Sequence, residues 1–266
     1  MLEILQYQFF QRALFAGILV AILSPLIGMY VVVRRYSALS DSLSHVALVG
    51  VAIGLITSFS PIFLGIVFSV IAGILIELLR SYKKVYTEAA LMLFLSGSIA
   101  VVSILISVFG GFRVSLSSFL FGSISTVTNN DLYWILGIFS LVIIIVAGFY
   151  NSFLQLSFSE DLAKISGVNV FWLRLLITVL ASMVVAIGIQ IVGGLLVGSL
   201  MVIPVITSLQ YKLGFKASHM LAVVISVFAL FVGFFAAYYL NIPTGGAIVI
   251  TNITFFLISL VFNWRK

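Results

Sequence analysis

Two residues in the stretch RRYSALSDSLSHVALVGVAIG carry side chains that could bind a metal ion. Asp41 and His45 are four residues apart, so on an α-helix they share one face, with their Cβ atoms about 6 Å apart. A carboxylate and a neutral imidazole are both good ligands for Zn²⁺, Mn²⁺ or Fe²⁺. With 7 acids in 266 residues, an acid stands at that distance before a given histidine only about 3 times in 100 by chance. The spacing therefore favours a shared site.

A structural role for the same pair is equally compatible with the spacing. An Asp–His hydrogen bond would neutralise both groups and hold helices together inside a membrane. If the pair instead binds metal, one helix offers only two ligands, which are too few for a zinc site. Two copies around a twofold axis would offer four ligands. Metal binding by this pair therefore predicts a homodimer.

The remaining acids and the second histidine suggest less specific roles. His219 follows Lys212 and Lys216 at the start of an apolar run, and we interpret it as interfacial rather than metal-binding. The other acids lie near the ends of apolar runs, where we expect solvation or local pairing. They are Glu3, Glu77, Glu88, Asp131, Glu160 and Asp161.

The composition indicates which solvent surrounds these residues. Hydrophobic residues make up 63% of the chain and charged residues only 8%, whereas a soluble domain carries about 25% charged residues. A soluble globule of this length could not hide so much apolar surface, so lipid must surround most of the chain. The chain has no cysteine, which excludes a disulfide framework and a thiolate metal site.

Nine apolar runs come close to the 20 or so residues that cross a bilayer. The second run is short and must include polar residues from Ser37 to Ser44, and the sixth and seventh meet near Gly193, so the total is eight or nine. The segment 114–127 is too short and too rich in serine to span alone, and we expect a re-entrant segment or a short buried helix. The runs cover roughly 13–33, 42–58, 62–80, 88–109, 131–150, 171–190, 191–211, 218–240 and 245–263.

The basic residues predict the orientation, because they collect in cytoplasmic loops. Nine alternating spans place all but Arg12 and Arg113 on one side, with the N-terminus outside and the C-terminus in the cytoplasm. The first run is too long for a signal peptide and is expected to be retained. The residues placed on the cytoplasmic side are Arg34, Arg35, Arg80, Lys83, Lys84, Lys164, Arg174, Lys212, Lys216, Arg265 and Lys266.

The longest predicted cytoplasmic connection is 151–170, which mixes apolar, acidic and basic residues. This pattern suits a short helix on a surface that faces the membrane or a partner. No GxxxxGK[ST] motif occurs in the chain, so it does not bind ATP through a phosphate loop. If transport is driven by ATP, the ATPase is another polypeptide.

Several motifs together resemble one family of membrane proteins. GMYVVVRRYSALSDSLSHVALVGVAIG resembles the early signature of the zinc and manganese ABC permeases, a family called ABC-3. Three further regions are similar to that family in the same order. They are FLFGSI at 119–124, FSEDLAKISGV at 158–168, and VGGLLVGSLMVIP at 192–204 followed by NIPTGGAIVI at 241–250. The resemblance covers nearly the whole chain.

The resemblance implies an all-α fold, a polytopic transmembrane helical bundle of the type II ABC importer class, with residues 1–266 as a single permease domain. It also implies three partners: a second copy of the chain, a cytoplasmic ABC ATPase dimer and an extracytoplasmic metal-binding protein. In that family the Asp and His of the early signature line the metal path, which corresponds here to Asp41 and His45. The segment 158–168 corresponds to the ATPase contact, through Glu160, Asp161, Leu162, Ala163 and Gly167.

The expected activity is therefore ATP-driven import of a divalent metal ion by a subunit that is not itself an enzyme. The motif SDSLSHVALVG lacks the Gly before the Asp and the later Pro that manganese members more often have, which favours Zn²⁺. Import of manganese or iron by the same architecture remains an alternative. A different class, a secondary transporter or channel in which Asp41 and His45 relay protons, would need no ATPase.

Overall fold

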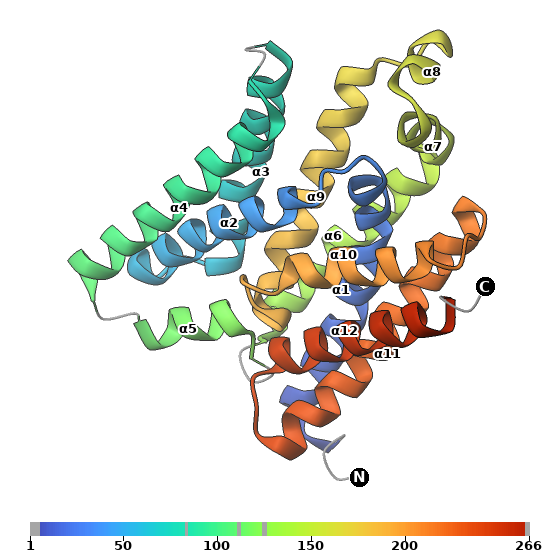
Figure 1. Ribbon diagram of the computed structural model, residues 1–266. Helices are drawn as coiled ribbons and strands as arrows, with labels where there is room; N and C mark the ends of the chain where they lie inside the picture. Colours follow the sequence, from blue (N-terminus) through green and yellow to red (C-terminus); the bar gives the residue numbers. More distant parts are fainter. Residues whose placement is uncertain (1–5, 83–84, 111–112, 124–126, 264–266) are drawn as a thin grey trace.

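The computed structural model describes residues 6–82, 85–110, 113–123 and 127–263. The regular elements within these ranges are helices (Figure 1). In chain order they are α1 Gln8–Val33, α2 Ala38–Thr57, α3 Pro61–Tyr82, α4 Thr87–Phe109, α5 Arg113–Phe121, α6 Asn129–Gly148, α7 Tyr150–Phe158, α8 Glu160–Ile165, α9 Val170–Val192, α10 Val197–Leu209, α11 Phe215–Leu240 and α12 Thr244–Asn263.

Eight of these helices are long and apolar enough to cross a membrane, namely α1, α2, α3, α4, α6, α9, α11 and α12. Their bounds follow the apolar runs closely, and the all-helical membrane fold is confirmed. The second run does include its polar flank, since α2 begins at Ala38. The serine-rich segment forms the short helix α5, as expected, but of its described side chains Leu116 is buried and Phe121 is exposed, so the expected burial is only partial.

The seventh predicted span, 191–211, is wrong as one continuous helix. Helix α9 extends to Val192, and α10 begins only at Val197. Between them Gly193 has φ +96°, a conformation that a residue with a Cβ rarely adopts. The 13 residues of α10 rise about 20 Å, less than the roughly 30 Å of a bilayer core. Of the two totals left open by the sequence, the described residues thus give eight full-length helices.

Close backbone packing explains why the chain breaks at this point. A Cβ on Gly193 would lie 2.5 Å from the Leu120 carbonyl oxygen at the end of α5. A Cβ on Gly245, at the start of α12, would overlap the Val192 carbonyl oxygen. Gly194 also donates a backbone hydrogen bond to Phe119 at 2.7 Å. Three sequence motifs, 119–124, 192–204 and 241–250, therefore meet at one place.

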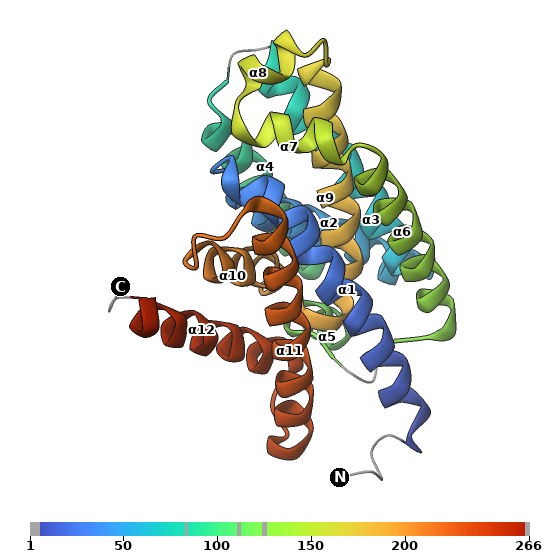
Figure 2. The ribbon, with the colours of Figure 1, turned by 90° about the vertical axis from the view of Figure 1, so that its right-hand side faces the viewer.

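Helix α9 lies at the centre of the arrangement (Figure 1). Helices α2, α3 and α4 lie on one side of it, and α10, α11 and α12 on the other, with α1 packed against both α9 and α11. The short helices α7 and α8 lie together at one end of the molecule, opposite the N-terminal end of α1 (Figure 2). The expected surface helix in 151–170 is thus two short helices.

Candidate functional site

Helix α2 accommodates its polar signature by bonding most of its hydroxyl groups locally. Ser40 and Ser44 donate to the backbone carbonyls of Ser37 and Asp41, at 2.9 and 2.8 Å. Ser42 donates to the Leu91 carbonyl of α4 at 3.0 Å, which joins the two helices. These serines are buried, and their hydrogen bonds satisfy the polar groups within the apolar bundle. The acidic and imidazole groups of the signature lie on a different face of α2.

Asp41 lies against the first turn of α10. A Cβ added at Gly198 would overlap the Asp41 Oδ1 atom and come within 3.0 Å of the Ser40 Oγ atom. One helical turn further along α2 is His45, and Leu48 on the same side packs against Gly194. Asp41 is exposed and His45 is half-buried in a single chain. This face of α2 therefore packs against α10 and also presents the Asp41 carboxylate and the His45 imidazole.

The pair has the composition of a partial metal site. No hydrogen bond joins the two side chains within the part of the chain that the structure describes, which weakens the purely structural alternative. Among those same residues no group of three or more His, Asp or Glu side chains gathers to hold a metal ion. One chain thus offers two ligands on this face, and a complete coordination shell would need water or a second copy.

His219 is held by contacts that the sequence did not indicate. It lies near the start of α11, as expected, but its side chain is only 6% exposed, and its Nε2 atom donates to the Leu26 carbonyl oxygen of α1 at 2.8 Å. Its ring packs edge-on against Tyr30 and Phe215. The hydrogen bond and the aromatic contacts fix α11 against α1, which is a packing role.

The five residues predicted to contact an ATPase do not share one orientation. Asp161 and Leu162 are exposed, with Leu162 at 54%, and Gly167 is an exposed turn residue with φ +78°. Ala163 is fully buried. Glu160 turns toward the membrane helices, where arginines surround its carboxylate. The segment thus has an outward side and an inward side.

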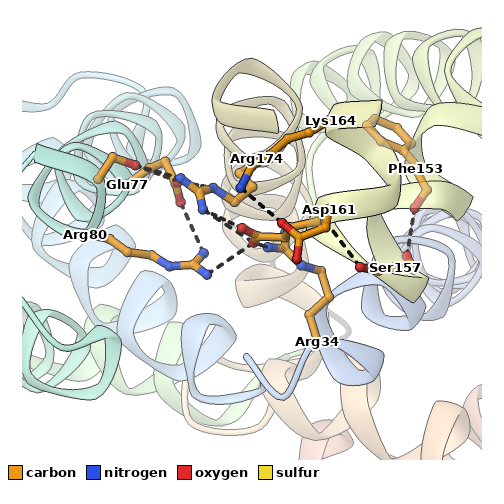
Figure 3. Close-up of polar contacts among 11 residues, drawn as sticks. Arg34, Glu77, Arg80, Phe153, Ser157, Asp161, Lys164 and Arg174 are labelled. Atoms are coloured by element: carbon orange, nitrogen blue, oxygen red, sulfur yellow. Dashed lines mark hydrogen bonds and ion pairs between the residues drawn. The ribbon is translucent and has the colours of Figure 1, made fainter. Parts of the chain in front are cut away.

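The inward side belongs to an ion cluster that joins α1, α3, α8 and α9. The Glu160 carboxylate pairs with Arg34 and with Arg174, the latter at 3.1 Å, and Arg80 is 3.7 Å away. Arg174 also contacts the fully buried Glu77 at 2.9 Å. Figure 3 shows Arg34, Arg80 and Arg174 pointing their guanidinium groups toward one another.

The cluster shifts the protonation equilibria of groups at this end of the molecule. Burial alone would raise the pKa of the Glu160 carboxyl, but Arg174 and Arg34 outweigh it and hold that pKa below its ordinary value. Burial and the nearby Arg80 lower the pKa of Arg34. Burial raises the pKa of Tyr36, whose ring lies under Arg80, to about 12. Glu160 therefore remains ionised at neutral pH.

The expected local pairing of acids is confirmed for Glu77, Asp131, Glu160 and Asp161, the last of which pairs with Lys164 at 3.3 Å. Glu88 is exposed, and Glu3 lies outside the described residues. The sequence did not reveal that arginines from three separate helices would gather around Glu160. Each arginine lies at an end of an apolar run, the usual pattern of a cytoplasmic loop. Only the packing of α1, α3 and α9 brings the three together.

Comparison with known proteins decides the family. The model of the ABC 3 transport family matches residues 6–263. The chain belongs to the ABC 3 transport family. This confirms the resemblance carried by the four motif regions, and it extends over nearly the full length of the chain.

Relatives within the ABC 3 transport family align along most of their own length. A "Probable metal transport system membrane protein" from Treponema pallidum is 34% identical over 96% of this chain and 96% of its own. The "Manganese import system permease protein ScaB" of Streptococcus parasanguinis is 31% identical, over 96% and 90%. The "High-affinity zinc uptake system membrane protein ZnuB" of Buchnera aphidicola subsp. Schizaphis graminum is 30% identical, over 92% and 94%.

A solved structure supports the same assignment. A chain of PsaBC from Streptococcus pneumoniae, determined in complex with Fab, superposes with a TM-score of 0.86 and 29% identity. The match covers 96% of this chain and 92% of that one. The helical permease architecture of the ABC 3 transport family is therefore present throughout the described helices.

Proposed function

We propose that this chain is the membrane-spanning permease of an ATP-driven importer of divalent transition metal ions, with Zn²⁺ as the cargo. Membership of the ABC 3 transport family and the metal-transport names of its relatives support the general activity. The observation that carries the proposal is the accessible carboxylate and imidazole of Asp41 and His45 on one face of α2.

The choice of Zn²⁺ rests on ligand chemistry. The zinc and manganese relatives are almost equally identical to this chain, at 30% and 31%, so identity does not separate the two ions. Imidazole suits zinc, whereas manganese prefers oxygen ligands. Two copies of the chain would supply two imidazoles and two carboxylates, a set that fits tetrahedral zinc. Manganese, or iron, is the alternative cargo.

Transport requires weak and temporary binding. An ion must enter a path and also leave it, so a site of few protein ligands with partial hydration suits the task better than a closed cage. Closure of an ATPase pair would bias the helix bundle between two packings that open the site to opposite sides in turn. In each packing the Asp41 carboxylate would offset the charge of the dication.

The transporter needs three further components: a second copy of this chain, a cytoplasmic ABC ATPase dimer and an extracytoplasmic metal-binding protein. The exposed side of α8 suits the ATPase contact, because Leu162 and Ile165 present apolar surface with exposures of 54% and 83% beside Asp161. Surface apolar groups of this kind mark interaction sites when they lie outside lipid. Gly167 allows the tight turn that ends this docking segment.

Metal uptake by cells carrying single variants tests the proposal. His45→Ala removes the imidazole ligand, and Asp41→Asn keeps the size of the side chain while removing its charge. Both should abolish uptake of radioactive zinc while expression, dimerisation and ATPase binding stay near normal. A structural hydrogen bond in a membrane contributes only about 0.6 kcal/mol, so loss of transport with intact assembly identifies an ion path. Wild-type uptake of both zinc and manganese by both variants would refute the site.

Parallel uptake of manganese decides the cargo. A zinc permease should take up Zn²⁺ in preference to Mn²⁺ when both are supplied at equal, limiting concentrations. A preference for Mn²⁺ would leave the proposed permease activity in place and identify manganese as the cargo. As a matched control, Glu88→Gln removes the charge of an exposed acid in the first turn of α4 and should leave uptake unchanged.

A further inference from the structure

The ion cluster beside α8 contains more charged groups than a single ion pair between two helices would need. Three guanidinium groups, from Arg34, Arg80 and Arg174, share two carboxylates, from Glu77 and Glu160. The arginine side chains are only 12 to 24% exposed, and Glu77 is fully buried. Buried charges of this kind must be paired to be tolerated.

Glu160 is the centre of this arrangement and the only contribution of α8 to it. Its two oxygens contact three arginines, of which Arg34 directly follows α1, Arg80 lies in α3 and Arg174 lies in α9. Helix α8 has only six residues, and its neighbouring side chains, Asp161 and Leu162, face outward. A displacement of α8 must therefore act directly on the arginines of three membrane helices.

The arginines of the cluster can also exchange carboxylate partners without leaving either glutamate unpaired. Arg80 lies 3.7 Å from both Glu77 and Glu160, through different nitrogen atoms. Arg174 likewise contacts Glu77 at 2.9 Å and Glu160 at 3.1 Å. Because one arginine is in excess, a shift of α8 can transfer Glu160 from one arginine to another. Salt-bridge networks that can take two arrangements carry coupling between distant sites, and the shared contacts of this cluster allow a second arrangement.

We propose that Glu160 is a positioning residue that couples movement of α8 to movement of α1, α3 and α9. Ser81 extends the linkage, since it accepts a hydrogen bond from Arg174 at 3.0 Å and donates one to Glu77 at 3.2 Å. Glu160 thus acts on the far side of the docking segment from the ATPase. The proposal rests on the proposed function, in which α8 contacts an ATPase.

The test uses the complete transporter with its ATPase, reconstituted in vesicles. Glu160→Gln keeps the shape of the side chain and removes the charge that the three arginines share. The ATPase should still copurify and hydrolyse ATP, while the zinc transported per ATP falls by about tenfold or more, within the range of typical allosteric coupling. Glu160→Asp keeps the charge and should recover much of this ratio. The exposed Glu88 supplies the control Glu88→Gln, which should match wild type.

Two results would overturn the proposal. One is a normal ratio of zinc to ATP in Glu160→Gln. The other is a pair of outcomes: Glu160→Gln fails to fold, whereas Glu160→Asp folds and couples normally. That pair of outcomes would mean that Glu160 only stabilises the fold. Failure of the proposed function looks different, since the wild-type chain would then neither copurify with an ATPase nor import metal.

Discussion

Gly198 and Asp41 form the contact on which the candidate ion site depends. The carboxylate occupies the space that a Cβ at position 198 would fill, so the backbone of α10 borders the ligand directly. The side chain is accessible from one direction and enclosed from the other. A ligand bordered by backbone is held more precisely than one bordered by flexible side chains, which suits a path that must bind an ion repeatedly in the same place.

Gly198→Ala should therefore impair transport without touching a ligand. The new methyl group must displace the Asp41 carboxylate, and a displacement that costs about 1.4 kcal/mol of ion affinity lowers it tenfold. Zinc uptake at limiting concentration should fall by about that factor, with normal amounts of protein in the membrane. Gly97→Ala in α4 is the matched control, because the added Cβ has no neighbour within 4 Å apart from its own stretch of helix backbone. Equal uptake by the two variants would show that Asp41 tolerates the displacement.

Residue-level chemistry could be predicted from the sequence only where the partners lie close along the chain. Asp41 and His45 share a helical turn, so their spacing was enough to indicate a common face. The contact between Asp41 and Gly198 and the ion pair between Arg34 and Glu160 each join residues more than 100 positions apart, and nothing in a single sequence shows that they meet. The packing of His219 could not be predicted for the same reason, since its partner Leu26 lies on another helix.

At the scale of elements, helix α6 begins with a capping box and an additional tertiary bond. The Thr128 hydroxyl accepts from the Asp131 backbone, and the Asp131 carboxylate accepts from the Thr128 backbone at 2.8 Å. Gln190, near the end of α9, donates its amide to the same carboxylate at 2.9 Å. One buried acid thus satisfies the first turn of α6 and links it to the central helix.

Asp131→Ala should destabilise the protein by about 1–3 kcal/mol, because it removes a cap and leaves a buried amide without this partner. Thermal unfolding in detergent should show a lower transition temperature than for wild type. Glu88→Ala is a suitable comparison, since Glu88 also lies in the first turn of a membrane helix but is exposed. Identical transition temperatures for both variants would contradict a stabilising role for the cap.

The elements themselves could largely be predicted, because a run of apolar residues has few alternatives in lipid. The run 191–211 was misjudged because hydropathy cannot register a backbone break. Gly193 and Gly194 were visible, but glycines are frequent in membrane helices. What makes this pair a break is the approach of α5 and α12 to the same point, which is a tertiary contact.

At the scale of the whole molecule, contacts between helix ends support an alternating path of the chain through the membrane. Arg34, Arg80 and Arg174 meet in one cluster, so the ends of α1 and α3 and the start of α9 lie together. The aromatic rings of Phe10 and Phe234 place the late part of α11 beside the early part of α1. Ser259 donates to Gln210 at 2.6 Å, so α12 ends beside α10. Although α10 is short, it thus carries the chain from Gly193 back toward the end of α12.

This path, combined with the basic bias of the loops, predicts that the N-terminus lies outside the cell and the C-terminus in the cytoplasm. The chain contains no cysteine, so single cysteines can be introduced at Gln6 and at Lys266 and probed in intact cells with a membrane-impermeant thiol reagent. The first should react at once, and the second only after the membrane is permeabilised. A third cysteine at Asp161 should behave like the second, because the arginine cluster holds α8 at the basic end of the bundle. Labelling of Lys266→Cys or Asp161→Cys, but not Gln6→Cys, in intact cells would reverse the topology and with it the side on which an ATPase could dock.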